Sequence, residues 1–341
     1  MNDEVRLSLE ETHALAVSAL RGQGYADRHA QAIADTLTAA ERDECKSHGL
    51  FRVPFYVKAL HEAGVSPDAE PVLRDLAPGV IQVDAHFGFA PLALQVAADP
   101  LEKRAREQGI AALAIVNAFN VSALWPEVER LAERGLVAFA FTAAHRYVAP
   151  AGGIRPIYGT NPMAFGWPRK GSPPLIFDQA SSMSARGEIQ IHLRDGKPLP
   201  PGWAIDAEGQ PTTDPKAALA GAQLTFGGYK GAAIALMVEL LAGALVGGPF
   251  SFEAHAKNTS GSGAPCGGEF MMAIDPARCL GSEDREGQLT HAETLFAEIL
   301  AQEGTRLPSD RRYRARQRTP QEGIVIPASL HKTLLEFTGS D

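Results

Sequence analysis

The sequence predicts a mixed α/β protein in which strands alternate with helices and both ends of the chain are helical. Apolar residues recur with helical spacing near both termini, and short apolar runs typical of buried strands lie between them. The 33 glycines and 24 prolines among 341 residues predict many tight turns. Hydrophobic residues make up 45% and charged residues 21%, which is typical of a folded globular chain of about two domains.

The first sixty residues are predicted to form three helices. Ser8 and Glu11 have the spacing of a capping box, so we expect the first helix to begin at Ser8 and to end at Gly22–Gly24. We expect the second helix over Asp27–Glu41 and the third over about Gly49–Ala63.

The centre of the chain alternates strands and helices. We expect strands at 80–83, 110–116 and 136–142, a helix at 91–109, and another helix that starts near Pro126. A glycine-rich, strand-prone region follows over 152–178, and Gln210–Asp214 is a predicted turn.

The last third returns to helices. Gly227–Gly231 opens an apolar helix that reaches about Val246, and Glu269–Ile274 is a predicted strand. A helix is expected over Gln288–Glu303, then the arginine-dense stretch Arg306–Arg318, and a final helix over Pro327–Phe337.

Charge and cysteine content restrict the class of protein. A net charge of −8 argues against a dedicated nucleic-acid binder. Three cysteines without CxxC spacing favour a reducing compartment. The first ten residues are polar and carry no secretory signal, and the longest apolar run, 232–246, contains Glu239 and is too short for a membrane span. We therefore expect a cytoplasmic protein that does not bind membranes.

Several common catalytic motifs are missing. The nearest match to the dinucleotide-binding pattern GxGxxG, Gly261–Gly268, has the wrong spacing and follows a polar segment, so we expect a loop there. The sequence contains no Walker A, HExxH or GxSxG pattern, and its ten histidines are scattered singly. We therefore expect no metal site.

The segment Lys46-Ser47-His48-Gly49-Leu-Phe-Arg52 combines three residue types that are useful in catalysis. A histidine at the start of a helix can exchange a proton near neutral pH. An arginine one turn later can bind a carboxylate, and Ser47 can hydrogen-bond the imidazole. The same residues could instead only cap a helix and leave Arg52 in solvent, and the spacing alone leaves both interpretations open.

Three further segments could contact a ligand, and each also has a plain structural explanation. Gly159-Thr160-Asn-Pro162 could present a hydroxyl and backbone amides or form an ordinary turn. Phe177-Asp178 with Arg186-Gly187-Glu188 could line a cleft. Gly227-Gly-Tyr229-Lys230-Gly231 could bind an anion at a helix start or only pack closely.

The arginines of residues 306–318 stand out in an acidic chain. Such a basic cluster fits a phosphate group, for example the 2′-phosphate of NADP, but it is equally typical of a solvated basic surface.

Together these segments resemble the malate/L-lactate dehydrogenase type 2 family of NAD(P)-dependent oxidoreductases. The matching segments occur in family order along nearly the whole chain: Ser47-His48-Gly49 with Arg52, Gly152-Gly153, Gly159-Thr-Asn-Pro162, Phe177-Asp178 with Arg186-Gly187, Pro201-Gly-Trp203 with Asp206, Pro211-Thr-Thr-Asp-Pro215, Gly227-Gly-Tyr-Lys-Gly231 and Arg306-Leu-Pro308. Each match is weak alone, whereas the ordered set is specific.

Within this family, three segments look most similar to the branch of cyclic imino acid reductases: Ala123-Leu-Trp-Pro-Glu127, Phe226-Gly-Gly-Tyr229 and Gly267-Gly-Glu-Phe270. The resemblance implies reduction of Δ1-piperideine-2-carboxylate to L-pipecolate and of Δ1-pyrroline-2-carboxylate to L-proline with NADPH, with a place in lysine catabolism. It also implies a non-Rossmann NADPH-binding domain with a largely antiparallel sheet over 116–284. A helical substrate and dimerisation domain would cover 1–115, with 285–341 returning to it, in a homodimer.

The resemblance also implies roles for individual residues. His48 would donate a proton to the ring nitrogen, with Ser47 and Glu188 in its relay, while Arg52 and Thr160 would hold the substrate. The cofactor would be lined by Asn120, Val121, Ser122, Ala123, Leu124, Trp125, Asp178, Gln179, Ala180, Arg186, Gly187, Tyr229, Lys230, Arg306, Leu307, Pro308, Ser309, Asp310, Arg311 and Arg312. Two positions depart from the pattern, since the branch favours aspartate at Glu188 and the family usually has histidine at Asn120.

Other functions remain open at this point. In a 2-hydroxy-acid dehydrogenase of the same family, acting on malate, lactate or a related ketoacid, His48 would protonate a carbonyl oxygen instead. A nucleic-acid-binding module built on Arg306–Arg318 and an inactive scaffold are the remaining alternatives.

Overall fold

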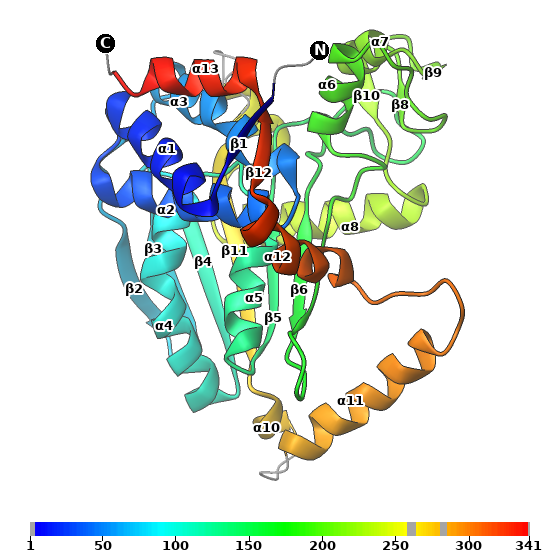
Figure 1. Cartoon of the computed structure of the whole chain (residues 1–341). Coiled ribbons are helices and arrows are strands. Elements are labelled where there is room, and N and C mark those ends of the chain that lie inside the picture. Colours follow the sequence, from blue (N-terminus) through cyan, green and yellow to red (C-terminus); the bar gives the residue numbers. More distant parts are fainter. Residues whose placement is uncertain (1–3, 258–263, 280–284, 340–341) are drawn as a thin grey trace.

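The computed structural model describes residues 4–257, 264–279 and 285–339. These residues form a seven-stranded sheet with helices on both faces, and a helical region at one end of the sheet (Figure 1). The mixed α/β prediction is therefore confirmed. Residues 261–263 of the imperfect GxGxxG match lie outside the described residues.

The N-terminal helices follow the prediction closely. They are α1 (Leu9–Gly22), α2 (Asp27–Arg42) and α3 (Val53–Glu62). The Ser8 hydroxyl accepts a hydrogen bond from the Glu11 amide at 3.0 Å, and the Glu11 carboxylate accepts one from the Ser8 amide at 2.7 Å. The capping box is thus confirmed.

The predicted third helix begins later than expected. Residues before α3 form two short 3₁₀ turns, η1 (Lys46–His48) and η2 (Leu50–Arg52). The buried Glu41 carboxylate accepts a hydrogen bond from the Leu50 amide at 2.8 Å, which anchors these turns to α2. A Cβ atom on Gly49 would lie 2.1 Å from the same carboxylate oxygen, so any larger residue here would force the Glu41 side chain to move.

The two ends of the chain meet in a small sheet that the sequence did not reveal. β1 (Glu4–Leu7) pairs antiparallel with β12 (Ile324–Pro327), and α13 (Ala328–Phe337) then packs on α1 (Figure 1). Strands of four residues are too short to give a clear periodicity, which explains why they were missed.

The large sheet has the strand order β2-β3-β4-β11-β5-β6-β7. Its strands are β2 (Val72–Ala77), β3 (Val80–Asp84), β4 (Ile110–Phe119), β5 (Val137–Thr142), β6 (Met163–Trp167), β7 (Leu175–Gln179) and β11 (Cys266–Ile274). Among these described strands, β3 and β4 pair in parallel and every other neighbouring pair is antiparallel. The domain boundary expected after residue 115 falls inside β4.

Helices cover both faces of this sheet. On one face, α4 (Ala90–Gln108) and α5 (Trp125–Glu133) enclose the largest apolar core. On the other face pack α8 (Tyr229–Glu239) and its continuation, the π-helical turn η3 (Leu240–Leu245). The apolar helix predicted up to about Val246 is therefore present, with a change of helix type near its end.

A small lobe beside the sheet corrects one expectation. It contains α6 (Arg186–Arg194), α7 (Pro215–Ala220) and a three-stranded sheet of β8 (Ala204–Ile205), β9 (Pro211–Thr212) and β10 (Ala222–Gln223). Residues 186–188, for which no secondary structure was predicted, open helix α6. The predicted turn at 210–214 contains strand β9, which pairs with β8.

The C-terminal region adds helices around the sheet. These are α9 (Ser251–Lys257), α10 (Pro276–Cys279), α11 (Arg285–Leu300) and α12 (Asp310–Glu322). Helix α11 lies along the lower edge of the molecule in Figure 1, where Arg169 pairs with Glu293 at 2.6 Å. The arginine-dense stretch, for which we predicted no structure, forms most of α12.

Candidate active site

A cavity of about 140 Å³ lies where η1, η2 and α3 meet the ends of β4 and β5 and the start of α6. Its walls include seven of the predicted site residues: His48, Arg52, Asn120, Val121, Ser122, Thr160 and Arg186. The remaining lining residues are Phe55, Thr142, Ala143, Ala144, His145, Tyr147, Pro162, Gln190 and Pro265. Tertiary packing thus brings together residues from distant parts of the sequence.

The side chains of η1 and η2 are held in place by one another. The Ser47 hydroxyl lies 3.1 Å from Nδ1 of His48, and Nε of Arg52 donates a hydrogen bond to the Ser47 carbonyl at 2.7 Å. Arg52 also lies over the Phe55 ring, 5.1 Å from its centre. The segment therefore directs an imidazole and a guanidinium into the same cavity, which is more than a helix cap requires.

Desolvation controls the charge of the cavity. Burial, reinforced by the nearby Arg52 charge, lowers the pKa of His48 to about 3, so the imidazole is neutral at pH 7. Burial also lowers the pKa of both Arg52 and Arg186. Neither guanidinium forms an ion pair with any described residue, so the cavity carries positive charge without a protein counter-ion.

Two residues of another wall, His145 and Tyr147, were not predicted from the sequence, although their neighbour Arg186 was. Arg186 lies over the Tyr147 ring, 4.0 Å from its centre, and its Nη2 donates to the Leu219 carbonyl at 3.2 Å. The ring of His145 meets that of Tyr147 edge-on, and burial followed by the His255 charge lowers the pKa of His145 to about 4. The available signal was the position of these polar rings directly after the buried strand β5.

A third wall is built around Asn120, at the end of β4. Its Nδ2 donates to Oε2 of Glu269 at 2.9 Å, and its Oδ1 accepts from the Ser122 amide at 2.8 Å. The Ser122 hydroxyl in turn lies 3.0 Å from the Tyr56 hydroxyl. Asn120 therefore connects the cavity to a buried carboxylate that the sequence analysis did not single out.

Several predicted cofactor residues form a second group at the start of α5. The Asp178 carboxylate accepts hydrogen bonds from the backbone amides of Leu124 and Trp125 at 2.8 and 3.1 Å. Arg312 lies over the Trp125 ring, 5.0 Å from its centre, and its Nη2 donates to Oγ of Ser309 at 3.0 Å. Burial raises the pKa of Asp178.

The other predicted residues lie outside these two groups or at their edges. Arg306 and Arg311 are exposed and have no ion-pair partner in the described part of the chain, and Asp310 accepts from the Leu307 amide at 2.9 Å. Tyr229 and Lys230 are exposed at the start of α8. Gln179 and Pro308 are exposed, Ala180 is half-buried, and Ala123 is buried beneath the start of α5.

Glu188 and Gly187 occupy different sides of α6. Gly187 is buried beside Arg52, because a Cβ atom on it would lie 3.5 Å from Nη2 of that arginine. Glu188 is exposed, and no hydrogen bond among the described residues joins its side chain to His48. The expected relay through Glu188 therefore remains a prediction.

The described residues contain neither a metal-binding cluster nor a membrane-spanning helix. No group of three or more His, Cys, Asp or Glu side chains among them is arranged to hold a metal ion. No described helix combines the length and the apolar character needed to cross a membrane.

The chain also matches known proteins over almost its whole length. It is 53% identical over 331 residues to the Delta(1)-pyrroline-2-carboxylate/Delta(1)-piperideine-2-carboxylate reductase of Pseudomonas aeruginosa, covering 97% of this chain and 98% of the relative. It is 43% identical over 334 residues to a (2R)-3-sulfolactate dehydrogenase (NADP(+)) of Chromohalobacter salexigens, covering 98% of each chain.

Similarity in structure agrees with similarity in sequence. The crystal structure of delta1-piperideine-2-carboxylate reductase from Pseudomonas syringae superposes with a TM-score of 0.90 at 39% identity, covering 98% of this chain and 99% of that one. The sequence profile of the malate/L-lactate dehydrogenase family matches residues 7–335. On this evidence, the chain belongs to the malate/L-lactate dehydrogenase family.

Proposed function

We propose that this protein reduces cyclic imino acids with NADPH, converting Δ1-pyrroline-2-carboxylate to L-proline and Δ1-piperideine-2-carboxylate to L-pipecolate. The observation that carries the proposal is a small cavity in which the neutral His48 lies beside Arg52, whose charge has no counter-ion in the described part of the chain. A desolvated guanidinium without a partner is unfavourable, and the carboxylate of an imino acid would supply that partner.

The proposed reaction needs one hydride and one proton. NADPH, when bound, supplies the hydride to C2, the carbon of the C=N bond. His48 supplies the proton to the ring nitrogen, so that C=N becomes CH–NH. The imidazole must take up a proton before it can act as an acid. In that form Nδ1–H would donate to the Ser47 hydroxyl, and the proton on Nε2 would be the one transferred.

Substrate binding would also tune His48. Arg52 contributes to the low pKa of the imidazole in the free protein. A bound carboxylate next to Arg52 would offset that positive charge and raise the pKa of His48. The imidazole could then recover a proton after each turnover.

The group around Asp178 and α12 fits a phosphate-bearing cofactor. Arg306 and Arg311 have no acidic partner among the described residues, and a 2′-phosphate would provide one. We propose that residues 116–284 form the NADPH-binding domain, of non-Rossmann type, joined at this edge by the start of α12. Residues 1–115 and 285–341 would form the substrate and dimerisation domain of a cytoplasmic homodimer.

A second candidate function is a 2-hydroxy-acid dehydrogenase acting on a dicarboxylate-like substrate. The specific observation in its favour is that Arg186 faces the same cavity as Arg52, so two guanidiniums could bind a substrate with two anionic groups. A relative of this chain is named a sulfolactate dehydrogenase, which fits the same idea.

A substrate panel separates the two functions. Purified protein is assayed by loss of NADPH absorbance with both cyclic imines and with pyruvate, oxaloacetate and sulfopyruvate. We expect kcat/KM for an imine to exceed that for every ketoacid by about 10²-fold or more, because the binding groups of the cavity must match the substrate's own. A preference for oxaloacetate or sulfopyruvate would replace the proposed function with the second candidate.

A further inference from the structure

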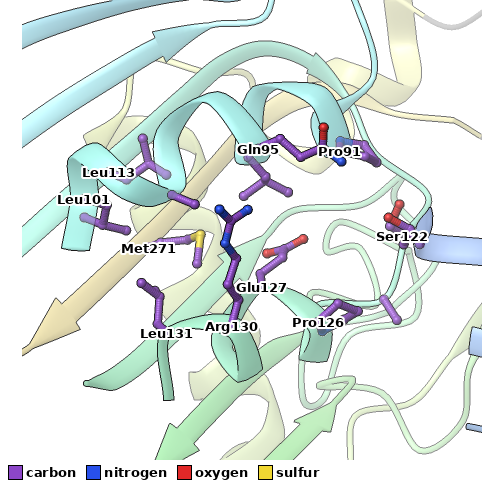
Figure 2. A pocket seen from close by; sticks show the side chains of 14 residues that line it. Pro91, Gln95, Leu101, Leu113, Ser122, Pro126, Glu127, Arg130, Leu131 and Met271 are labelled. Carbon is purple, nitrogen blue, oxygen red and sulfur yellow. The ribbon is translucent and has the colours of Figure 1, made fainter. Parts of the chain in front are cut away.

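Two acidic side chains meet behind the Asn120 wall of the active-site cavity. Glu127 is in the first turn of α5, and Glu269 is on β11, at the end of a β-bulge that begins at Gly267. Glu127 also lines a separate apolar cavity of about 170 Å³ between α4 and α5, and Figure 2 shows its carboxyl group in that cavity, with Ser122 at one edge. Neither acid was used in the proposed reaction.

The contacts of these carboxyl oxygens indicate that one of the two acids is protonated. Oε2 of Glu127 and Oε1 of Glu269 have no exposed surface and accept no hydrogen bond from any described N–H or O–H group. The two side chains are nevertheless in hydrogen-bonding contact with each other. Two carboxylates offer only acceptors, so such a contact requires that one of them be protonated.

The surroundings make a second negative charge unfavourable. Burial is the main cause that raises the pKa of each acid, and the charge of Glu269 raises the pKa of Glu127 further, with a smaller contribution from Asp178. Arg130, a cation that lines the same cavity as Glu127, is paired with Asp99 at 3.1 Å. Neither Glu127 nor Glu269 forms an ion pair in the described part of the chain.

We propose that Glu127 and Glu269 share a single proton and act as positioning residues, which hold the Asn120 amide in the orientation that shapes the active-site wall. Glu269 is then the anionic member, because its Oε2 accepts from Nδ2 of Asn120 at 2.9 Å. The opposite side of the amide accepts from the Ser122 backbone at 2.8 Å, so its orientation is set from both sides.

Loss of the shared proton would disturb this wall. Two adjacent anions in a desolvated site repel each other, and their separation would remove the acceptor that Asn120 needs. Ser122, whose hydroxyl contacts Tyr56, would also lose the Asn120 oxygen that accepts a hydrogen bond from its backbone amide. Because this wall would bind the substrate and take no part in the chemical step, we expect loss of the shared proton to change KM more than kcat.

The first test measures the proton itself and requires no substrate. In Glu127→Gln, an amide N–H replaces the shared proton. Wild type and variant are compared by Tm from about pH 5 to about pH 9, above the ordinary pKa of a glutamate. In this range the folded wild type holds the shared proton and the unfolded chain does not, so unfolding releases a proton and wild type loses stability relative to the variant as pH rises.

A wild-type Tm that falls steadily relative to the Tm of Glu127→Gln as pH rises supports the shared proton. A Tm difference between the two proteins that does not change with pH overturns it. Glu107→Gln is the matched control, because this glutamate is exposed on α4 and the same carboxyl-to-amide replacement is made there. The Tm difference between Glu107→Gln and wild type should stay constant as pH rises.

The second test measures positioning, and it rests on the proposed function. At neutral pH, Glu127→Gln should keep kcat/KM for the imine within about threefold of wild type, whereas Glu127→Ala should raise KM by about tenfold with a smaller change in kcat. A wild-type KM in Glu127→Ala overturns the positioning role. If the wild type does not reduce imines at all, the proposed function fails, while the Tm comparison still decides whether the proton is shared.

Discussion

The active-site cavity and helix α12 both concentrate arginines, but the two regions use them in opposite ways. In the cavity, Arg52 and Arg186 are desolvated and have no ion pair among the described residues. In α12, Arg316 bridges the carboxylates of Asp43 and Glu129 at 2.6 and 2.7 Å. The density of arginines along a sequence therefore does not tell which of them are available to a ligand.

The α12 contacts explain how this helix is attached. Asp43, at the end of α2, also accepts a hydrogen bond from Nε1 of Trp125 at 3.1 Å, so it joins α2, α5 and α12. The Tyr313 hydroxyl adds hydrogen bonds to Glu129 and to the Pro174 carbonyl at 3.1 and 2.6 Å. Much of the basic stretch thus has a structural role, and few of its arginines remain for a cofactor.

The largest expected effect concerns the cavity. His48→Ala should lower kcat for the imine by about 10²–10⁴-fold, because the ring nitrogen loses its proton donor, while the Kd for NADPH stays unchanged. Single-turnover kinetics and a fluorescence titration with NADPH measure the two quantities. His61→Ala, which removes an exposed histidine of α3, is the control. Wild-type turnover in His48→Ala would show that the cavity histidine is not the acid.

The next effect concerns stability and belongs to α12. Arg316→Ala should lower the free energy of unfolding by about 3 kcal/mol, because it leaves the buried Asp43 carboxylate without its main cation and the guanidinium itself is mostly buried. Urea denaturation measures the loss. Arg318→Ala, two residues further, removes only exposed pairs with Glu44 and Glu322 and should change stability little. Equal losses in the two variants would contradict this division.

The smallest effect tests which arginines remain available. The double variant Arg306→Ala/Arg311→Ala should raise KM for NADPH by about tenfold and KM for NADH far less, because only NADPH carries a 2′-phosphate. Initial rates with each cofactor provide the comparison. Arg314→Ala is the control, since this arginine donates to the Asp310 carbonyl of its own helix. Equal changes for both cofactors would leave these arginines without a role in phosphate recognition.

Local signals in the sequence predicted local structure well. The capping box at Ser8 placed the start of α1, and the apolar run after Gly135 placed β5 within one residue. The His48–Arg52 spacing left a helix cap and a ligand site as alternatives, and the structure places both side chains in the wall of one cavity. Each of these depends on neighbours in the sequence, where helix caps, strand runs and one-turn spacing operate.

Features formed by distant segments were not predictable in this way. β1 and β12 are about 320 residues apart and too short to be recognised singly. Tyr147 carries no motif, and it enters the site because Arg186 of another element stacks on it. The contact between Glu127 and Glu269 depends on a β-bulge and on the packing of α5 against the sheet.

By itself, the sequence determined the mixed α/β class, most helix and strand positions, the Ser47-His48-Arg52 constellation and the resemblance to a dehydrogenase family. Only the tertiary structure decided which charges are neutralised and which remain available. It paired Arg316 with buried carboxylates, left Arg52 without a counter-ion among the described residues, and lowered the pKa of His48 to about 3. The reason is that desolvation and ion pairing depend on which atoms surround a group in space, and residue spacing along the chain does not contain that information.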